Sequence, residues 1–415
     1  MTNEEKLTAY LNELDIHTLR SVARRIGVYS PTTKIKTELI DGISDIVFKR
    51  TEAVVPSKRG APVKDRDVDF SILDRIWSFS TDYSYTPTEA RKLSVRFASS
   101  ESVYEGATFC GILLFADEPL LVGKREKLPF PITFIQELGL REGDFIVCKI
   151  KNTGDDLAVK EILSVNLRIR SKKWDRIRFD SYESAYPSEL YPLPLKSETM
   201  RAIDFFAPIG YGQRVECRFF HKTDRCSFFV DLLSSVSSSD HVLFLHAGMS
   251  KEETNELTEA FQSAEHYFVD PSMDAEENLL TLHMVQERVK RISEEKENVF
   301  LVLNSLGGIY RISPSKCYKL FALARHIECG DVTVFGITSK EEMQNDELSS
   351  LANCVLDFAQ TAQAKLDPMR SYTKREEKFC SLKKVKLAER VREDFNLMKK
   401  WENSMSNAVF EEENS

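Results

Sequence analysis

The 415-residue sequence lacks any apolar run near the ~20 residues that a helix needs to cross a bilayer, which argues against a membrane protein. Its N-terminus is acidic and has no hydrophobic secretion signal, so we expect a cytoplasmic chain with no membrane partner. The eight cysteines are scattered and form no CxxC pair. This pattern disfavours a disulfide framework and a structural zinc site, and we expect no bound metal.

The sequence also lacks an excess of positive charge. Its formal net charge is -8, which does not by itself indicate a nucleic-acid-binding protein, although a local basic face could still bind phosphates. The hydrophobic share of 42% and the charged share of 29% are typical of a globular protein. The length predicts two to four domains.

Residues 1–50 are predicted to form three short helices, because apolar side chains recur there at i, i+3, i+4, i+7 spacing. The three sets are Leu7, Tyr10, Leu11 and Leu14, then Leu19, Val22, Ala23 and Ile26, and then Ile35, Leu39, Ile43 and Ile46. We expect the third helix to begin in the segment Ser30-Pro31-Thr32-Thr33. Basic side chains in this region either contact phosphates or are simply solvated, and both interpretations stay open. They are Arg20, Arg24, Arg25, Lys34 and Lys36.

Residues 51–102 are predicted to be a linker, since proline and glycine punctuate the segment, with a short helix within residues 69–79. From residue 103 to about residue 165, period-two runs separated by Gly and Asp turns predict a small β-barrel. A basic stretch with one tryptophan follows the barrel and suits either a groove for a nucleic-acid backbone or a charged connector. Its members are Arg168, Arg170, Lys172, Lys173, Trp174, Arg176 and Arg178.

The C-terminal part, residues 179–415, alternates between strand-like and helix-like segments. Residues 242–245 and 299–303 are predicted strands, and residues 252–261 and 280–292 are predicted helices. Such alternation predicts a parallel α/β sheet.

Several long segments, in order along the chain, resemble the transcription termination factor Rho family. They are Leu140 to Ile150, Arg201 to Gly210, the run Ala207 to Arg214 and Leu366 to Glu377. The resemblance implies a multidomain α/β protein: a SAP-like helical module at 1–50, a linker at 51–102, an OB-fold barrel at 103–178 and a RecA-like domain at 179–415. In Rho the last domain is an RNA-dependent ATPase and helicase.

The segment that aligns with the family's phosphate-binding loop has lost its glycines. It reads Phe219-Phe220-His221-Lys222-Thr223-Asp224-Arg225-Cys226, so the degenerate nucleotide positions are 222–226. The family glycine, lysine and Mg²⁺-binding threonine fall on Asp224, Arg225 and Cys226. An aspartate adds negative charge beside phosphates, and a thiol is a poor ligand for Mg²⁺.

The other catalytic positions that the resemblance assigns are also changed. The Walker B aspartate falls on Asn304, and the glutamate that polarises water falls on Met249, whose thioether cannot act as a general base. The two central RNA-gripping loops fall on the short segment Leu306 to Tyr318 and on the glycine-free segment Asn345 to Glu347. We therefore expect a protein that does not hydrolyse ATP and has no nucleotide or Mg²⁺ cofactor.

Some elements of RNA binding and ring assembly are retained. Leu120 and Val122 replace two rings that stack on RNA bases in Rho, which weakens the stacking platform. Arg370 falls where Rho has an arginine finger, and its alternative role is an interface salt bridge. The RNA-binding candidates are Lys124, Phe130, Lys149, Arg168, Arg170, Lys172, Lys173 and Trp174.

Three hypotheses follow from these residues. The first is a non-hydrolysing Rho-like protein that regulates transcription termination, with single-stranded RNA, authentic Rho or the RNA polymerase machinery as partners in a homo- or hetero-oligomeric ring. The second is an atypical RNA-dependent ATPase that uses Arg225 in place of lysine and binds ATP and Mg²⁺. The third is a non-enzymatic interaction scaffold.

Overall fold

The computed structural model describes residues 3–26, 28–48, 50–51, 72, 76, 108–116, 118–123, 126–153, 156–169, 176–237, 240–248, 250–328, 330–341 and 346–404. It divides into two compact units, one formed by residues 1–94 with 163–170 and the other by residues 95–162 with 171–415. Within the described ranges, every helix is too short or too polar to span a lipid bilayer.

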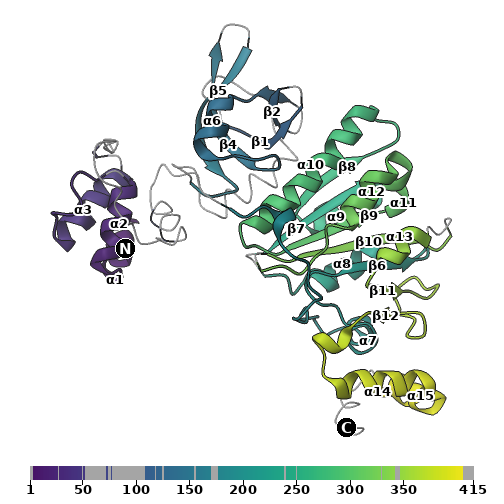
Figure 1. Ribbon diagram of the computed structural model, residues 1–415. Helices are drawn as coiled ribbons and strands as arrows, with labels where there is room; N and C mark the ends of the chain where they lie inside the picture. The colour runs from purple at the N-terminus through teal and green to yellow at the C-terminus, as the bar shows by residue number, and fades with distance from the viewer. Residues whose placement is uncertain are drawn as a thin grey trace. The chain divides into compact units, whose positions relative to one another are not determined.

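Within residues 3–48 of the first unit, the described part of the chain forms the three predicted helices (Figure 1). They are α1 (Asn3–Glu13), α2 (Ile16–Ile26) and α3 (Lys36–Val47). The third begins at Lys36 and not in the Ser30 segment, because Ser30 has a positive φ of 46° and the chain turns there. The Lys36 ammonium donates hydrogen bonds to the carbonyls of Asn12 and Leu14, so its role is to join α3 to the end of α1. Ile76, from the predicted linker helix, is buried in the same core.

The second unit contains a five-stranded antiparallel sheet in the region where alternation predicted a barrel. Its elements are β1 (Thr108–Phe115), β2 (Pro119–Val122), β3 (Lys127–Pro129), α6 (Ile132–Leu138), β4 (Phe145–Thr153) and β5 (Asp156–Val165). The strand order is β3-β2-β1-β4-β5, and Ile112 in β1 pairs with Val122 on one side and Phe145 on the other. The assignment of this sheet to the OB fold stays a prediction.

The same unit contains a seven-stranded sheet in which neighbouring strands are parallel, except that β11 and β12 are antiparallel. The strands are β6 (Arg214–Phe219), β7 (His241–Ala247), β8 (Glu265–Val269), β9 (Val299–Asn304), β10 (Val332–Ser339), β11 (Cys354–Asp357) and β12 (Tyr372–Thr373). Their order is β12-β11-β6-β10-β9-β7-β8. The predicted parallel α/β sheet is confirmed, and β7 and β9 contain the two predicted strands.

Helices cover both faces of this sheet. They are α7 (Glu198–Phe206), α8 (Arg225–Leu233), α9 (Lys251–Ala260), α10 (Ala275–Glu294), α11 (Leu306–Ile312), α12 (Pro314–Phe321), α13 (Asp346–Leu351), α14 (Leu382–Glu393) and α15 (Phe395–Ser404), with 3-10 turns η1 (Phe179–Ser181) and η2 (Glu376–Lys378). Phe300 and Val302 of β9 pack with α7, α8 and α14, whereas α10, α11 and α12 contact the sheet from the other side, as alternation along a strand requires. The segment 306–318, expected as a shortened loop, is instead helical in α11 and the start of α12.

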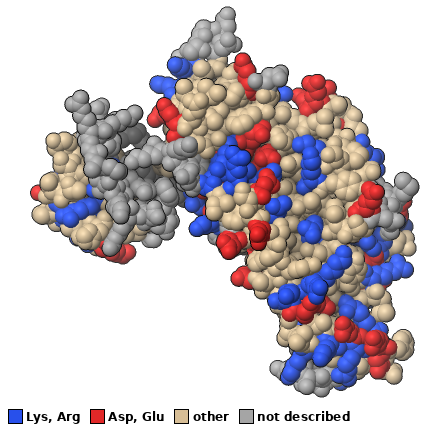
Figure 2. Space-filling view, viewed as in Figure 1, with Lys and Arg blue, Asp and Glu red and all other residues tan. Residues whose placement is uncertain are grey.

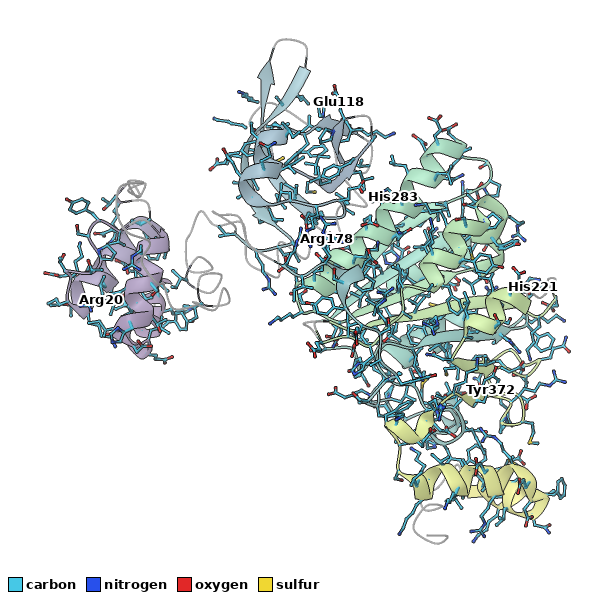
Figure 3. The ribbon with its side chains drawn as sticks, viewed as in Figure 1. Arg20, Glu118, Arg178, His221, His283 and Tyr372 are labelled. Atoms are coloured by element: carbon cyan, nitrogen blue, oxygen red, sulfur yellow. The ribbon has the colours of Figure 1, made fainter. Side chains whose placement is uncertain are left out.

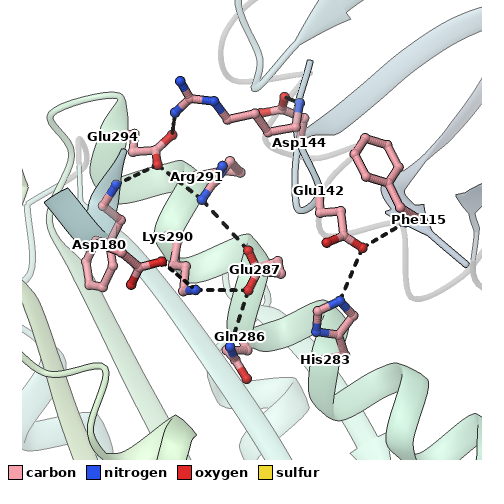
Figure 4. Close-up of polar contacts among 12 residues, drawn as sticks. Phe115, Glu142, Asp144, Asp180, His283, Gln286, Glu287, Lys290, Arg291 and Glu294 are labelled. Atoms are coloured by element: carbon pink, nitrogen blue, oxygen red, sulfur yellow. Dashed lines mark hydrogen bonds and ion pairs between the residues drawn. The ribbon is translucent and has the colours of Figure 1, made fainter. Parts of the chain in front are cut away.

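An ionic cluster joins the five-stranded sheet to α10 (Figure 4). The Arg176 guanidinium bonds both oxygens of Asp144 and lies 3.4 Å from Glu294, the last residue of α10. Arg141 lies 3.1 Å from the same glutamate, whose pKa is raised by burial. Only 3% of the Arg176 side chain is accessible, so this member of the basic stretch is paired inside the protein and not placed to contact a nucleic-acid backbone.

Candidate nucleotide and RNA sites

The loop between β6 and α8 occupies the position expected for a phosphate-binding loop. Asp224 is the N-cap of α8: one carboxylate oxygen accepts the Ser227 N–H at 3.0 Å, and the other accepts the Ser227 hydroxyl at 2.6 Å. A helix N-terminus attracts anions because its first N–H groups have no partner within the helix. Here a carboxylate of the protein already lies at that end of α8.

The neighbouring loop residues are held by packing within the chain. Thr223 is buried, and its hydroxyl donates to the Thr361 carbonyl at 3.0 Å. The Asp224 N–H donates to the Ala362 carbonyl at 2.8 Å, so it is already paired within the chain. Lys222 is exposed, as is His221, which Figure 3 labels on this loop.

A cavity of about 360 Å³ lies beside this loop and is bounded on the far side by α9. Arg225, which takes the place of the family lysine, lies 3.5 Å from Glu253 of α9, and Glu256 lines the same cavity. Burial raises the pKa of the Cys226 thiol, which favours the protonated form over the thiolate that binds metals. The cavity lining therefore includes three carboxylates, those of Asp224, Glu253 and Glu256, and two cations, Lys222 and Arg225.

Asn304 ends β9 and is fully buried, so it does not face the cavity as a Walker B aspartate would. Its amide nitrogen lies 3.4 Å from His246 Nδ1, and the second ring nitrogen of His246 lies 3.1 Å from His266 Nδ1. Burial, with a smaller effect from His266, lowers the pKa of His246 to about 3, so this ring is neutral. Met249 lies outside the described residues. Sequence reasoning missed both histidines, because each sits in an apolar strand without a recognisable motif.

No group of three or more His, Cys, Asp or Glu side chains that could hold a metal ion occurs in the described part of the chain. The seven cysteines described there are all free.

The structure separates the RNA-binding candidates into three groups. Phe130 is only 4% exposed and packs against Phe134, so the prediction that it contacts RNA is wrong: its ring belongs to the core. Lys149 on β4 is accessible and lies 3.4 Å from Glu161 on β5, while Arg168 lies at the turn after β5. The other candidates lie outside the described residues. They are Lys124, Arg170, Lys172, Lys173 and Trp174.

Charges of both signs are mixed on the visible surface of the described residues, as Figure 2 shows. Arg178, at the end of the basic stretch and labelled in Figure 3, is exposed. Arg370 is also exposed, with 69% of its side chain accessible and a distance of 3.7 Å to Asp367. The degenerate nucleotide positions 222–226 all line the cavity beside α8. Arg370 of the same chain does not line it.

No protein-family model matches the chain. Curated relatives named transcription termination factor Rho include proteins of Streptosporangium roseum, with 31% identity over 187 residues, and Pseudomonas aeruginosa, with 24% identity over 312 residues. The chain is similar in sequence to these Rho proteins. The first match covers 44% of this chain and 47% of the relative, and the second covers 65% and 74%. A Rho protein of Borreliella burgdorferi is 24% identical over 246 residues, with 53% of the chain and 48% of the relative covered.

The chain spans about half the length of the Streptosporangium roseum and Borreliella burgdorferi proteins. Among solved structures, an ATPase of a bacterial type III secretion system has a TM-score of 0.44 at 14% identity, covering 56% of this chain and 77% of that chain. The assembled ATPase EscN of enteropathogenic E. coli also has a TM-score of 0.44 at 14% identity, covering 62% and 80%. Scores this low carry no conclusion about function.

Proposed function

We propose that this chain is a Rho-related protein that acts in transcription termination through RNA or through a Rho ring and does not hydrolyse ATP. The observation that carries the proposal is the Asp224 carboxylate at the N-terminus of α8, where a nucleotide phosphate would have to bind. Transcription termination is proposed as the process because the similar curated proteins are named transcription termination factor Rho.

Electrostatics supports the absence of nucleotide binding. A triphosphate in the cavity beside α8 would approach the carboxylates of Asp224, Glu253 and Glu256, and like charges at short range repel. Entry of a phosphate at the helix end would also break the two bonds from Asp224 to Ser227. With asparagine at position 304, no carboxylate would hold Mg²⁺ at the end of β9.

RNA binding, if it occurs, depends on charge more than on stacking. Val122 is buried and Phe130 belongs to the core, so neither presents an aromatic face to a base. Lys149, Arg168 and Arg178 remain as described cations for phosphate contacts. Binding through phosphates weakens steeply as salt concentration rises.

A joint assay with authentic Rho as the positive control tests the proposal. ATP hydrolysis would be measured with and without cytidine-rich single-stranded RNA, and ATP and RNA binding would be measured by calorimetry. We expect no hydrolysis above the protein-free rate, no ATP binding, and either RNA binding or co-purification with Rho. RNA-stimulated hydrolysis would contradict the proposal.

The atypical ATPase hypothesis has one observation in its favour, since Arg225 lines the cavity. It requires ATP binding that Arg225→Ala abolishes and that Lys383→Ala, a change at an exposed lysine of α14 outside the cavity lining, leaves in place. If the chain binds neither RNA nor Rho, the scaffold hypothesis remains. The same set of measurements therefore separates the three hypotheses.

A further inference from the structure

Ser188, His326 and Asp331 form a hydrogen-bonded series away from the degenerate nucleotide loop. The Ser188 hydroxyl lies 2.8 Å from His326 Nε2, and His326 Nδ1 lies 2.9 Å from an Asp331 carboxylate oxygen. Ser188 is exposed, His326 is partly exposed and Asp331 is buried, so accessibility increases from the acid to the hydroxyl. The Ile327 N–H also donates to the same Asp331 oxygen at 3.1 Å, which fixes the carboxylate.

The backbone holds the histidine and the aspartate in this geometry. Reciprocal hydrogen bonds of 3.0 and 3.1 Å between Arg325 and Val332 close the short loop that carries both residues. Gly212 packs directly against this loop with a φ of +84°, and a Cβ there would lie only 2.5 Å from the backbone nitrogen of His326. A glycine at this position is therefore required by both the backbone conformation and the close approach.

The serine is positioned by the same region of the chain. The Ala185 N–H donates to the His326 carbonyl at 3.2 Å, which ties the segment before Ser188 to the histidine. Pro187, which immediately precedes Ser188, packs on Gly210, where an added Cβ would lie 2.7 Å from the proline Cβ. The two glycines of the Rho-like run 207–214 thus support the two halves of the Ser-His-Asp series.

The hydrogen-bond directions suit a general base. With Asp331 ionised, His326 donates its Nδ1–H to the carboxylate, and its Nε2 then accepts the Ser188 hydroxyl proton. A hydroxyl becomes a nucleophile when an adjacent base removes its proton and a third group orients that base. The N–H groups of Ser188 and Glu189 donate to no protein acceptor among the described residues.

We propose that Ser188, His326 and Asp331 form an acyl-transfer site for small carboxylic esters. Ser188 Oγ bonds to the ester carbonyl carbon while His326 Nε2 takes the hydroxyl proton. The carbon–alkoxide bond then breaks, and the alkoxide leaves with that proton as an alcohol. Water attacks the acyl-serine in the same way, releases the carboxylic acid and returns the proton to Ser188.

Labelling with a fluorophosphonate probe, read by mass spectrometry of the digested full-length chain, tests this proposal. We expect the probe mass on the peptide that contains Ser188, and we expect Ser188→Ala to lose the label. The matched control is Ser184→Ala, because Ser184 is an exposed serine on the same segment. This variant should keep the label on the Ser188 peptide. Wild-type protein that stays unlabelled, or Ser188→Ala protein that labels equally, would overturn the proposal.

Turnover of p-nitrophenyl acetate provides the second readout. Removal of the base in His326→Gln should lower the rate by about 100-fold or more, the usual contribution of general base catalysis. Asp331→Asn should lower the rate as well, because an amide favours the wrong histidine tautomer, while leaving the thermal midpoint of the chain close to wild type. Rates unchanged in both variants would show that the three side chains only anchor the loop and would refute the site.

Discussion

Asn304 of β9 and His246 of β7 lie opposite each other on neighbouring strands and are neutral partners. The Asn304 amide donates toward His246, and the rings of His246 and His266 are nearly parallel, with centroids 5.4 Å apart. A carboxylate at position 304 would lie buried beside this pair, where desolvation opposes charge. The change of a single residue type at the Walker B position therefore fits the neutral surroundings that the fold provides.

The histidine pair predicts an acid-sensitive stability. Because the pKa of His246 is about 3 in the folded state and near 6.5 in the unfolded state, only the unfolded chain takes up this proton as pH falls below 6.5. The stabilisation present above that pH is lost between pH 6.5 and 3. We expect His246→Gln to reduce the loss of unfolding free energy between pH 7 and pH 5 by up to about 2 kcal/mol, measured by urea unfolding.

His221→Gln is the control for this prediction, since His221 is exposed on the loop after β6. Its urea midpoints should follow those of the wild-type chain at both pH values. His266 also has a lowered pKa because of burial, so the His246→Gln variant should keep part of the acid sensitivity. Equal acid sensitivity of wild type and His246→Gln would contradict the lowered pKa of His246 as a cause of the stability loss.

At the scale of the element, the N-terminus of α8, the end of a helix that attracts anions, is capped by the protein's own Asp224 carboxylate. The sequence predicted that Asp224 opposes phosphate binding, and the structure adds that the same carboxylate starts the helix. Capping side chains satisfy N–H groups that otherwise have no partner in the helix. One residue therefore both stabilises α8 and blocks the end at which a phosphate would bind.

The cap makes a quantitative prediction. Asp224→Ala should lower the free energy of unfolding by about 1 kcal/mol, the usual loss for removing an aspartate N-cap, as measured by urea unfolding. Asp231→Ala on the same helix removes an exposed carboxylate and should change stability by less than about 0.5 kcal/mol. If the two variants are equally stable, Asp224 does not act as the cap in solution.

At the scale of the whole molecule, buried charges connect the five-stranded sheet of the second unit to helix α10. Arg176, Asp144 and Glu294 have almost no accessible side-chain surface, although each carries a formal charge. Buried charges persist only when they are paired and hydrogen-bonded. The five-stranded sheet and α10 therefore depend on each other for charge neutralisation.

The ionic cluster at Arg176 predicts that a buried and an accessible ion pair contribute differently to the free energy of unfolding. Asp144→Ala leaves Arg176 buried with an incomplete set of partners, and we expect a loss of about 3–5 kcal/mol in unfolding free energy by denaturant titration. Glu161→Ala removes only the accessible pair with Lys149 and should change stability by less than about 1 kcal/mol. Similar losses of unfolding free energy in both variants would contradict a stabilising role of the buried cluster.

Local patterns were enough to predict the three N-terminal helices and two strands of the parallel sheet. The periodic apolar residues of 1–50 and the apolar runs at 242–245 and 299–303 specified helices and strands, because spacing along the chain decides which side chains share a face. The resemblance located the degenerate loop at 222–226, and the helix found directly after it follows that expectation. The segment 306–318 was missed as helix, since it was interpreted only through the loop it replaces.

The sequence by itself determined the periodicity, the parallel α/β class and the altered residue types at the nucleotide positions. Only the tertiary structure decided which charges are buried, placing Arg176 between Asp144 and the end of α10, and Phe130 in a core. It also decided which distant side chains meet: Ser188 and His326 are 138 positions apart, and His246 and Asn304 are 58 apart. Contacts of this kind depend on how strands and loops pack in three dimensions, which spacing along the chain does not encode.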